Sequence, residues 1–253
     1  MIEESMIQRR SFWLILGLLI AGFAFIGCGP QRSALVKPHP TPMPTLATLP
    51  KPRALADVIA VLDAPVRQRL QAELARTALH LPFAEMALLA FKQERRLEVW
   101  ARQDGGWRWF KTYPFTAFSG ALGPKLREGD GQIPEGVYGV AYLNPNSQYH
   151  LSIKVAYPNA FDRAMGAVDG RERLGGDIFI HGKDKTIGCI PIGDRGIEEL
   201  FYLVDATGID NVRIVIAPYD MRQGARGFLA GGVPWSGRLY RDIALALRDF
   251  QRV

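Results

Sequence analysis

Between residues 82 and 220 the chain consists of short apolar runs separated by glycine, proline and asparagine turns, and this feature restricts the fold most. The turn at Asp104-Gly105-Gly106, between two such runs, is a strong hairpin signal. The chain holds 26 glycines and 17 prolines and shows no heptad pattern. These features predict a β-rich domain, mainly β with a few helices.

Helical spacing of apolar residues occurs on both sides of the predicted strands and once among them. Residues 54–81 form a short helical region, in which we expect two helices separated near Ala64-Pro65. Residues 194–208 predict an amphipathic helix that ends at Gly208. The C-terminal extension, residues 221–253, contains a further helical pattern.

The N-terminus is typical of an exported protein. Residues 11–27 carry no charge and follow Arg9-Arg10, as in a secretory signal, although a retained anchor helix fits the same run. The end of the run, Phe-Ile-Gly-Cys at 25–28, resembles a bacterial lipoprotein processing site. This resemblance implies that residues 1–27 are a signal and that Cys28 is lipidated. We expect the protein in the cell envelope, outside the cytoplasm, held at a membrane by the lipid or by an uncleaved anchor.

Residues 28–53 are rich in proline, which forbids a helix and favours an extended polyproline conformation. We expect this segment to be a semi-rigid linker. The helical region 54–81, the β-rich domain at 82–220 and the extension 221–253 follow it.

The net charge of +6 suits polyanionic partners in general. The sequence has no zinc-finger or helix-turn-helix spacing and no basic run interleaved with aromatic residues. We therefore expect no nucleic-acid partner. The oligomeric state stays open.

Only two cysteines are present, Cys28 and Cys189. If Cys28 carries lipid, Cys189 has no disulfide partner in its own chain, although exported proteins meet an oxidising compartment. A single remaining thiol of this kind is a candidate reactive residue.

The stretch IFIHGKDKTIGCIPIGD, residues 178–194, surrounds this cysteine. We expect His181 at a strand end and a tight turn that brings it within hydrogen-bond reach of Cys189. Gly188 allows close backbone approach, so the amides near the sulfur are candidate oxyanion donors. Lys183 and Lys185 are expected to lower the pKa of the thiol.

Two other interpretations of Cys189 remain. Free cysteines are commonly buried and inert. Alternatively, His181, Asp184 and Cys189 could ligate zinc, although the sequence offers no evident fourth ligand.

The order His-Gly, a loop with a hydroxyl residue and Gly-Cys-Ile resembles the signature of L,D-transpeptidase catalytic domains of the YkuD type. Residues 123–140, with Pro-Glu-Gly-Val-Tyr before a predicted strand, are similar to another segment of that family. Residues 143–163 most resemble its YafK-like branch. Together these blocks lie within roughly residues 85–220.

The resemblance implies an L,D-transpeptidase-like β-sandwich or barrel with one helix after the catalytic cysteine. Cys189 would be the nucleophile on peptidoglycan stem peptides, His181 the general base and acid, and the Gly188 and Cys189 amides the oxyanion donors. No cofactor is implied. The common family pattern has an arginine two places after the cysteine, where this chain has Pro191. This departure leaves a hydrolase of existing peptidoglycan links, or peptidoglycan–protein links, as an alternative to a transpeptidase. A lipid-anchored wall-binding module without activity is the third alternative.

Four further residues are candidates for substrate binding. His150 and Ser152 are expected on one face of a strand, where they either line the groove or form a polar pair at a sheet surface. Lys125 lies in a glycine-bounded loop and either meets an acidic stem peptide or is solvated. The Thr186 hydroxyl is expected to orient the loop before Cys189.

Overall fold

The computed structural model describes residues 44–223 and 232–251. The apolar N-terminal run, Cys28 and most of the expected linker lie outside this range. Within it, no helix combines the length and the apolar character that crossing a bilayer requires.

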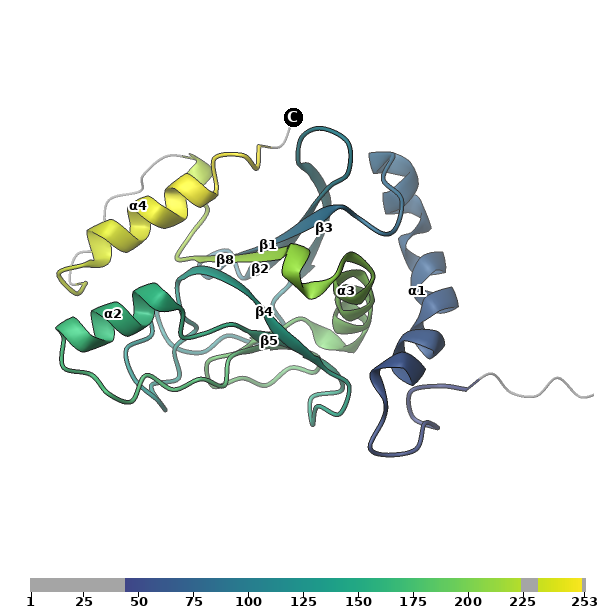
Figure 1. The fold of residues 1–253 in the computed structure, drawn as a ribbon, viewed down its shortest axis with the longest axis horizontal. Helices are drawn as coiled ribbons and strands as arrows, with labels where there is room; N and C mark the ends of the chain where they lie inside the picture. The colour runs from purple at the N-terminus through teal and green to yellow at the C-terminus, as the bar shows by residue number, and fades with distance from the viewer. Residues whose placement is uncertain (1–43, 224–231, 252–253) are drawn as a thin grey trace, which may run out of the picture. The chain divides into compact units, whose positions relative to one another are not determined.

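Eight strands form one mixed sheet in the order β3-β2-β1-β8-β4-β5-β6-β7. Figure 1 labels β1 to β5 and β8. Strands β1 and β8 pair in parallel, as do β6 and β7, and the other neighbours are antiparallel. The strands are β1 (Glu85–Phe91), β2 (Arg96–Arg102), β3 (Arg108–Pro114), β4 (Gly136–Asn144), β5 (Ser152–Val155), β6 (Phe179–His181), β7 (Ile190–Pro191) and β8 (Val212–Ala217). The expected β-rich fold is confirmed, and its strands are joined in one continuous sheet.

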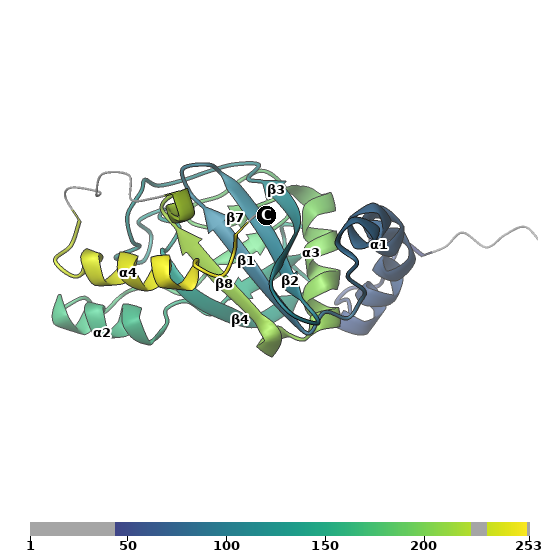
Figure 2. The same cartoon turned by 90° about the horizontal axis from the view of Figure 1, so that it is seen from above.

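The central strands are covered on both faces. Leu88 of β1 lies in one apolar cluster, whereas its neighbours Ala87 and Leu89 lie in a second cluster. Successive strand side chains point to opposite faces, so β1 contributes to both clusters. Helices α1 (Leu55–Thr77) and α3 (Gly193–Thr207) cover one face, and α4 (Ser236–Ala246) covers the other (Figure 2).

The expectation of two helices at residues 54–81 is wrong, because α1 is one continuous helix with Pro65 inside it. An interior proline removes one backbone hydrogen bond and costs about 3 kcal/mol. The helix nevertheless continues because its apolar face is buried on both sides of Pro65, with Leu62 and Leu70 at most 2% exposed. This face contacts α3 and β3.

The last residues of the expected linker are not a solvated spacer. Leu46 is 9% exposed and belongs to the larger apolar cluster. The Arg53 amide donates a hydrogen bond to Asn146 at 2.7 Å, and the Arg53 guanidinium donates to the His150 carbonyl at 2.9 Å. This part of the chain is therefore fixed on the domain, a contact that proline content alone does not predict.

The helix expected at 194–208 is confirmed as α3, which begins at Gly193, directly after β7. A shorter helix, α2 (Ala160–Val168), begins with a capping box of Asn159 and Asp162. Two 3-10 turns flank β8, η1 (Ile209–Asn211) and η2 (Met221–Gln223). Helix α4 lies in the C-terminal extension, where the sequence shows a helical pattern.

Candidate active site

The two short strands β6 and β7 carry the candidate catalytic residues. His181 is the last residue of β6, and Cys189 immediately precedes β7. Ile180 pairs with Ile190, and both side chains are fully buried in the core. Because side chains alternate along a strand, His181 and Cys189 both point to the opposite face, away from the core.

The strands run in parallel, so His181 and Cys189 are diagonal neighbours. His181 pairs with Pro191, and the same register places Cys189 beside Phe179. The offset is two residues, about 6.6 Å along a strand at about 3.3 Å per residue. No hydrogen bond joins the thiol and the imidazole among the described residues. The chain thus returns beside β6 as expected, but the expected hydrogen bond between the two side chains is not formed.

The protonation of His181 follows from its contacts. Nδ1 lies 2.6 Å from the Gly182 carbonyl oxygen, which can only accept a hydrogen bond, so Nδ1 carries the proton and Nε2 is unprotonated. The ring packs against Tyr149 with centroids 4.5 Å apart. Burial lowers the pKa of His181, partly opposed by the bond to Gly182, so the imidazole is neutral near pH 7. A neutral ring with a free Nε2 is the form that a general base requires.

The Cys189 thiol is half-buried and donates a hydrogen bond to the Asp177 carbonyl at 3.5 Å. Burial raises its pKa, although the Phe179 backbone N–H and the Lys154 and Lys125 ammonium groups act in the opposite direction. The lysines that lower this pKa are Lys154 and Lys125, not Lys183 and Lys185 as expected, and desolvation has the larger effect. The site thus holds a neutral thiol and a neutral imidazole.

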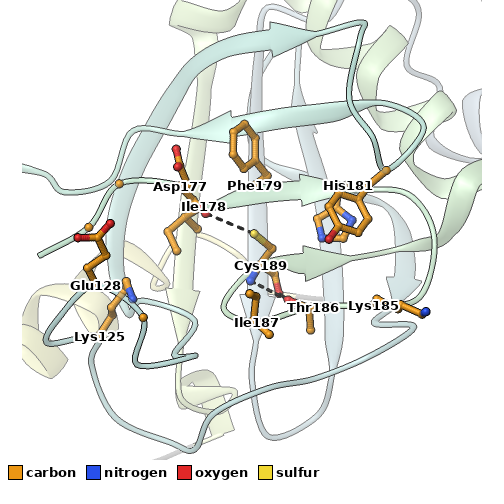
Figure 3. Close-up of a pocket in the computed structure, with 14 residues that line it drawn as sticks. Lys125, Glu128, Asp177, Ile178, Phe179, His181, Lys185, Thr186, Ile187 and Cys189 are labelled. Carbon is orange, nitrogen blue, oxygen red and sulfur yellow. Dashed lines mark hydrogen bonds between the residues drawn. The ribbon is translucent and has the colours of Figure 1, made fainter.

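Thr186 is bonded to the backbone of the candidate nucleophile. Its hydroxyl accepts from the Cys189 amide at 2.7 Å and donates to the Cys189 carbonyl at 2.8 Å. Figure 3 shows this contact at the cavity wall. The hydroxyl therefore orients the loop before β7.

Gly188 has a different role from the expected one. It is buried, with φ of +115°, and its amide donates to the Ser119 hydroxyl at 2.7 Å. Gly188 also lines neither cavity at the thiol, so its amide is not placed to bind an oxyanion. Only glycine adopts such a backbone conformation readily.

Position 182 requires a glycine because neighbouring oxygen atoms lie too close to leave room for a side chain. A Cβ there would lie 2.5 Å from an Asp194 oxygen and 2.7 Å from the Tyr149 carbonyl oxygen. The His-Gly pair thus allows the chain to leave β6 between α3 and the segment that carries Tyr149.

Two cavities meet at the thiol. One, of about 310 Å³, extends towards Lys125 and Glu128, and the other, of about 500 Å³, extends towards Asn144 and Gln148. Five residues line both cavities: Tyr149, Asp177, Phe179, His181 and Cys189. Figure 3 places Lys125 and Glu128 on one side of Cys189 and His181 on the other. The thiol is therefore accessible from two directions.

Ser152 and His150 do not share a groove as expected. Ser152 lies in β5, pairs with His181 and lines the larger cavity. His150 precedes β5 with φ of +75°, and its ring binds Glu198 of α3 at 2.9 Å. The left-handed backbone at His150 breaks the alternation that the expectation assumed.

Lys125 lines the smaller cavity, but its ammonium group is largely enclosed. It donates to the Arg127 carbonyl at 2.8 Å and to the Asp130 carboxylate, and its side chain is only 6% exposed. These bonds hold the ammonium group within its own loop.

The alternative zinc site is not assembled. In residues 44–223 and 232–251, no group of three His, Cys, Asp or Glu side chains is placed to hold a metal ion.

Sequence reasoning missed several residues at this site. Tyr149 and Asp177 line both cavities, and Ser119 bonds the Gly188 amide across 69 positions of sequence. Tyr149 lies near an Asn-Pro-Asn turn, which is a signal for a loop but not for contact with His181. No local pattern marks Ser119.

The family model for the L,D-transpeptidase catalytic domain, YkuD, matches residues 86–216, just over half of the chain. This match includes both His181 and Cys189.

Two similar curated proteins carry the name "Putative L,D-transpeptidase YafK", from Escherichia coli strain K12 and from Escherichia coli O157:H7. Each is 36% identical over 136 residues, which cover 52% of this chain and 53% of the relative. The match thus spans about half the length of these relatives.

Similar solved structures include the helical cell shape determining protein Pgp2 from Campylobacter jejuni, at 24% identity and a TM-score of 0.46 over 56% of this chain and 50% of that one. L,D-transpeptidase 1 from Mycobacterium tuberculosis matches at 14% identity and a TM-score of 0.31, over 53% of this chain and 62% of that one.

Proposed function

The chain belongs to the L,D-transpeptidase catalytic domain (YkuD) family, and on that premise we propose that it is a cell-envelope cysteine acyltransferase acting on peptidoglycan stem peptides. The observation that carries the proposal is the position of Cys189 and His181. Both face away from the core on neighbouring strands, where two cavities meet. The substrate class comes from the family.

The proposed reaction has two acyl-transfer steps. The Cys189 sulfur attacks the carbonyl carbon between diaminopimelate and D-alanine, and its proton passes to His181 Nε2. The C–N bond then breaks, the leaving amine takes the proton from the imidazolium, and a thioester remains on Cys189. An acceptor amine attacks the thioester, His181 removes its proton, and the thiol is regenerated.

The neutral state of both groups sets the order of events. The thiol is not ionised in advance, because burial raises its pKa, so it must lose its proton as it attacks. The imidazole is neutral and can accept that proton. The two side chains are offset by two residues along their strands, so proton transfer requires that they approach each other or that one water bridges them.

The Cys189 amide is the donor best placed for the tetrahedral oxygen. Both Cys189 and Thr186 line the smaller cavity, and the amide already donates to the Thr186 hydroxyl. An oxyanion accepting from this amide shares it with Thr186 Oγ1. Charge-assisted hydrogen bonds are about twice as strong as neutral ones, so the oxyanion gains the larger share.

Two cavities at one thiol support transfer to an acceptor amine. The acyl donor occupies one cavity and leaves the other for the acceptor. Water as the acceptor would instead give a hydrolase of existing links through the same thioester. Pro191, which stands where the common family pattern has arginine, is buried in β7 and supplies no charge for a substrate carboxylate.

Membrane attachment through lipid on Cys28, or through an uncleaved anchor, is part of the proposal. It rests on the N-terminal sequence. In this arrangement peptidoglycan is the partner of the exported domain.

The test is incubation of the full-length protein and its Cys189→Ala variant with purified sacculi, followed by mass spectrometry of the muropeptides. New diaminopimelate-to-diaminopimelate links that require Cys189 would establish a transpeptidase. Loss of existing links or of attached protein would establish a hydrolase. Muropeptides unchanged by the wild-type protein would contradict the proposal and favour a wall-binding module.

A further inference from the structure

A loop far from Cys189 in sequence contacts Gly188, the residue before it. We name residues 119–132 the buttress loop. Its Ser119 hydroxyl accepts from the Gly188 amide at 2.7 Å and donates to the Gly131 carbonyl at 2.9 Å. The hydroxyl thus ties the residue before the candidate nucleophile to both ends of the loop.

Gly188 fits closely against the same loop. A Cβ at Gly188 would lie 3.1 Å from the Gln132 carbonyl oxygen. The turn before Cys189 therefore rests on the backbone of the loop, and the Ser119 bond fixes its orientation there. Two kinds of contact, packing and a hydrogen bond, converge on one residue.

The loop is itself held together by internal bonds. Asp130 accepts from the amides of Leu126, Arg127 and Gln132 at 2.9 to 3.1 Å and from the Lys125 ammonium group. The Gln132 side chain accepts from the Ala121 amide at 2.6 Å. These bonds hold the loop that carries Ser119 in one conformation.

The two peptide groups before the thiol are each fixed by a hydroxyl. Thr186 holds the amide of Cys189, and Ser119 holds the amide of Gly188. Thr186 belongs to the same turn and moves with it, whereas Ser119 belongs to the buttress loop. Among the residues that the structure describes, Ser119 is the one outside this turn whose side chain bonds either amide.

We propose that Ser119 is a positioning residue for Cys189, acting through the Gly188 amide. The role in catalysis rests on the proposed acyl transfer. The effect on the thiol does not: Gly188 directly precedes Cys189, so loss of the Ser119 bond should let the sulfur move away from the Phe179 backbone N–H, which lowers the pKa of Cys189.

The test compares wild type with Ser119→Ala, Ser119→Thr and Ser236→Ala in the full-length protein. Ser119→Thr retains the hydroxyl. Ser236→Ala is the matched control, because Ser236 is a buried serine at the beginning of α4 and lines neither cavity. Circular dichroism and thermal unfolding confirm that each variant is folded.

The first readout is the rate of Cys189 alkylation by iodoacetamide across pH, with Cys28 distinguished by peptide mass. Ser119→Ala should alkylate about three- to tenfold more slowly at pH 7, with its pH midpoint moved upwards, and Ser119→Thr and Ser236→Ala should match wild type. A Ser119→Ala profile equal to that of wild type would overturn the proposal. Equal impairment of Ser119→Ala and Ser119→Thr would also overturn it, because the hydroxyl would then not be the cause.

The second readout is the rate of Cys189-dependent muropeptide conversion. Ser119→Ala should lower kcat about tenfold and leave KM within about twofold, since the change orients the nucleophile without touching substrate. A change in KM alone would overturn the positioning role. If wild type itself converts no muropeptide, the proposed function fails while alkylation still decides the role of Ser119.

Discussion

The Thr186 hydroxyl and the Cys189 backbone form a closed pair of hydrogen bonds, in which the hydroxyl accepts from the amide at 2.7 Å and donates to the carbonyl at 2.8 Å. Both bonds lie at the wall of the cavity that contains the thiol. The peptide group that carries the nucleophile is therefore oriented before substrate arrives. Preorganised donors of this kind are a large source of rate enhancement in acyl transfer.

Replacing Thr186 with valine removes both bonds and keeps the shape of the side chain. A typical hydrogen bond contributes about 1 kcal/mol, so the loss of both, about 2 kcal/mol, should lower kcat roughly 30-fold. Thr186→Ser keeps the hydroxyl and should retain most of the activity. Muropeptide conversion measures the effect, and full activity of Thr186→Val would show that Thr186 does not orient the nucleophile.

The pH dependence follows from two opposite shifts. Burial lowers the pKa of His181 below its ordinary 6.5, so the acid limb of kcat/KM should have its midpoint below pH 6.5. Burial raises the pKa of Cys189 above its ordinary 9.0, so the alkylation midpoint should lie above pH 9.0. Titration of both rates provides the check. An acid limb above pH 6.5, or a thiol ionised at neutral pH, would contradict the neutral pair.

Pro65 lies within α1 and should reduce stability. Pro65→Ala restores a backbone donor and removes the clash with the preceding turn, which should raise the free energy of unfolding by roughly 1–3 kcal/mol. Pro234→Ala is the matched control, because Pro234 is exposed and precedes α4. Urea unfolding of the variants measures both, and destabilisation by Pro65→Ala would mean that the ring packs favourably.

Asp162 gives a second test of stability. Burial raises its pKa from 3.8 to about 6, so the folded protein retains a proton there that the unfolded chain loses. Its stabilising contribution is complete below pH 3.8 and is lost as the pH rises through 6. Asp162→Asn stays neutral and keeps an oxygen acceptor for the capping box. The melting temperature of Asp162→Asn minus that of wild type should therefore rise by several degrees between pH 4 and pH 7. If the two melting temperatures change with pH in the same way, the raised pKa of Asp162 is contradicted.

The sequence predicts the strands and helices whose periodicity is strong. The amphipathic pattern of 194–208 corresponds to α3, and the Asp104-Gly105-Gly106 turn joins β2 to β3. Pro65 leads to the wrong prediction of two helices, because proline disfavours the helix interior. Burial of the apolar face of α1 on both sides of Pro65 keeps the helix continuous. Propensity is a weak guide where tertiary packing opposes it.

The site is harder to predict than the fold. The motif around residues 178–194 points to His181 and Cys189, but strands as short as β6 and β7 carry no signal for parallel pairing, which sets the offset between the two residues. The pKa of Cys189 depends on burial, which the neighbouring lysines in the sequence do not reveal. The Ser119–Gly188 contact joins residues 69 positions apart and has no local pattern.

The measurement that tests the central claim most directly is detection of the thioester. The full-length protein and its Cys189→Ala variant are mixed with a tetrapeptide stem donor, quenched in acid and examined by intact and peptide mass spectrometry. The proposed mechanism predicts an added mass equal to the donor minus its terminal D-alanine, located on the peptide that contains Cys189 and absent from the variant. Product formation at the wild-type rate by Cys189→Ala, without any adduct on Cys189 in the wild type, would contradict it.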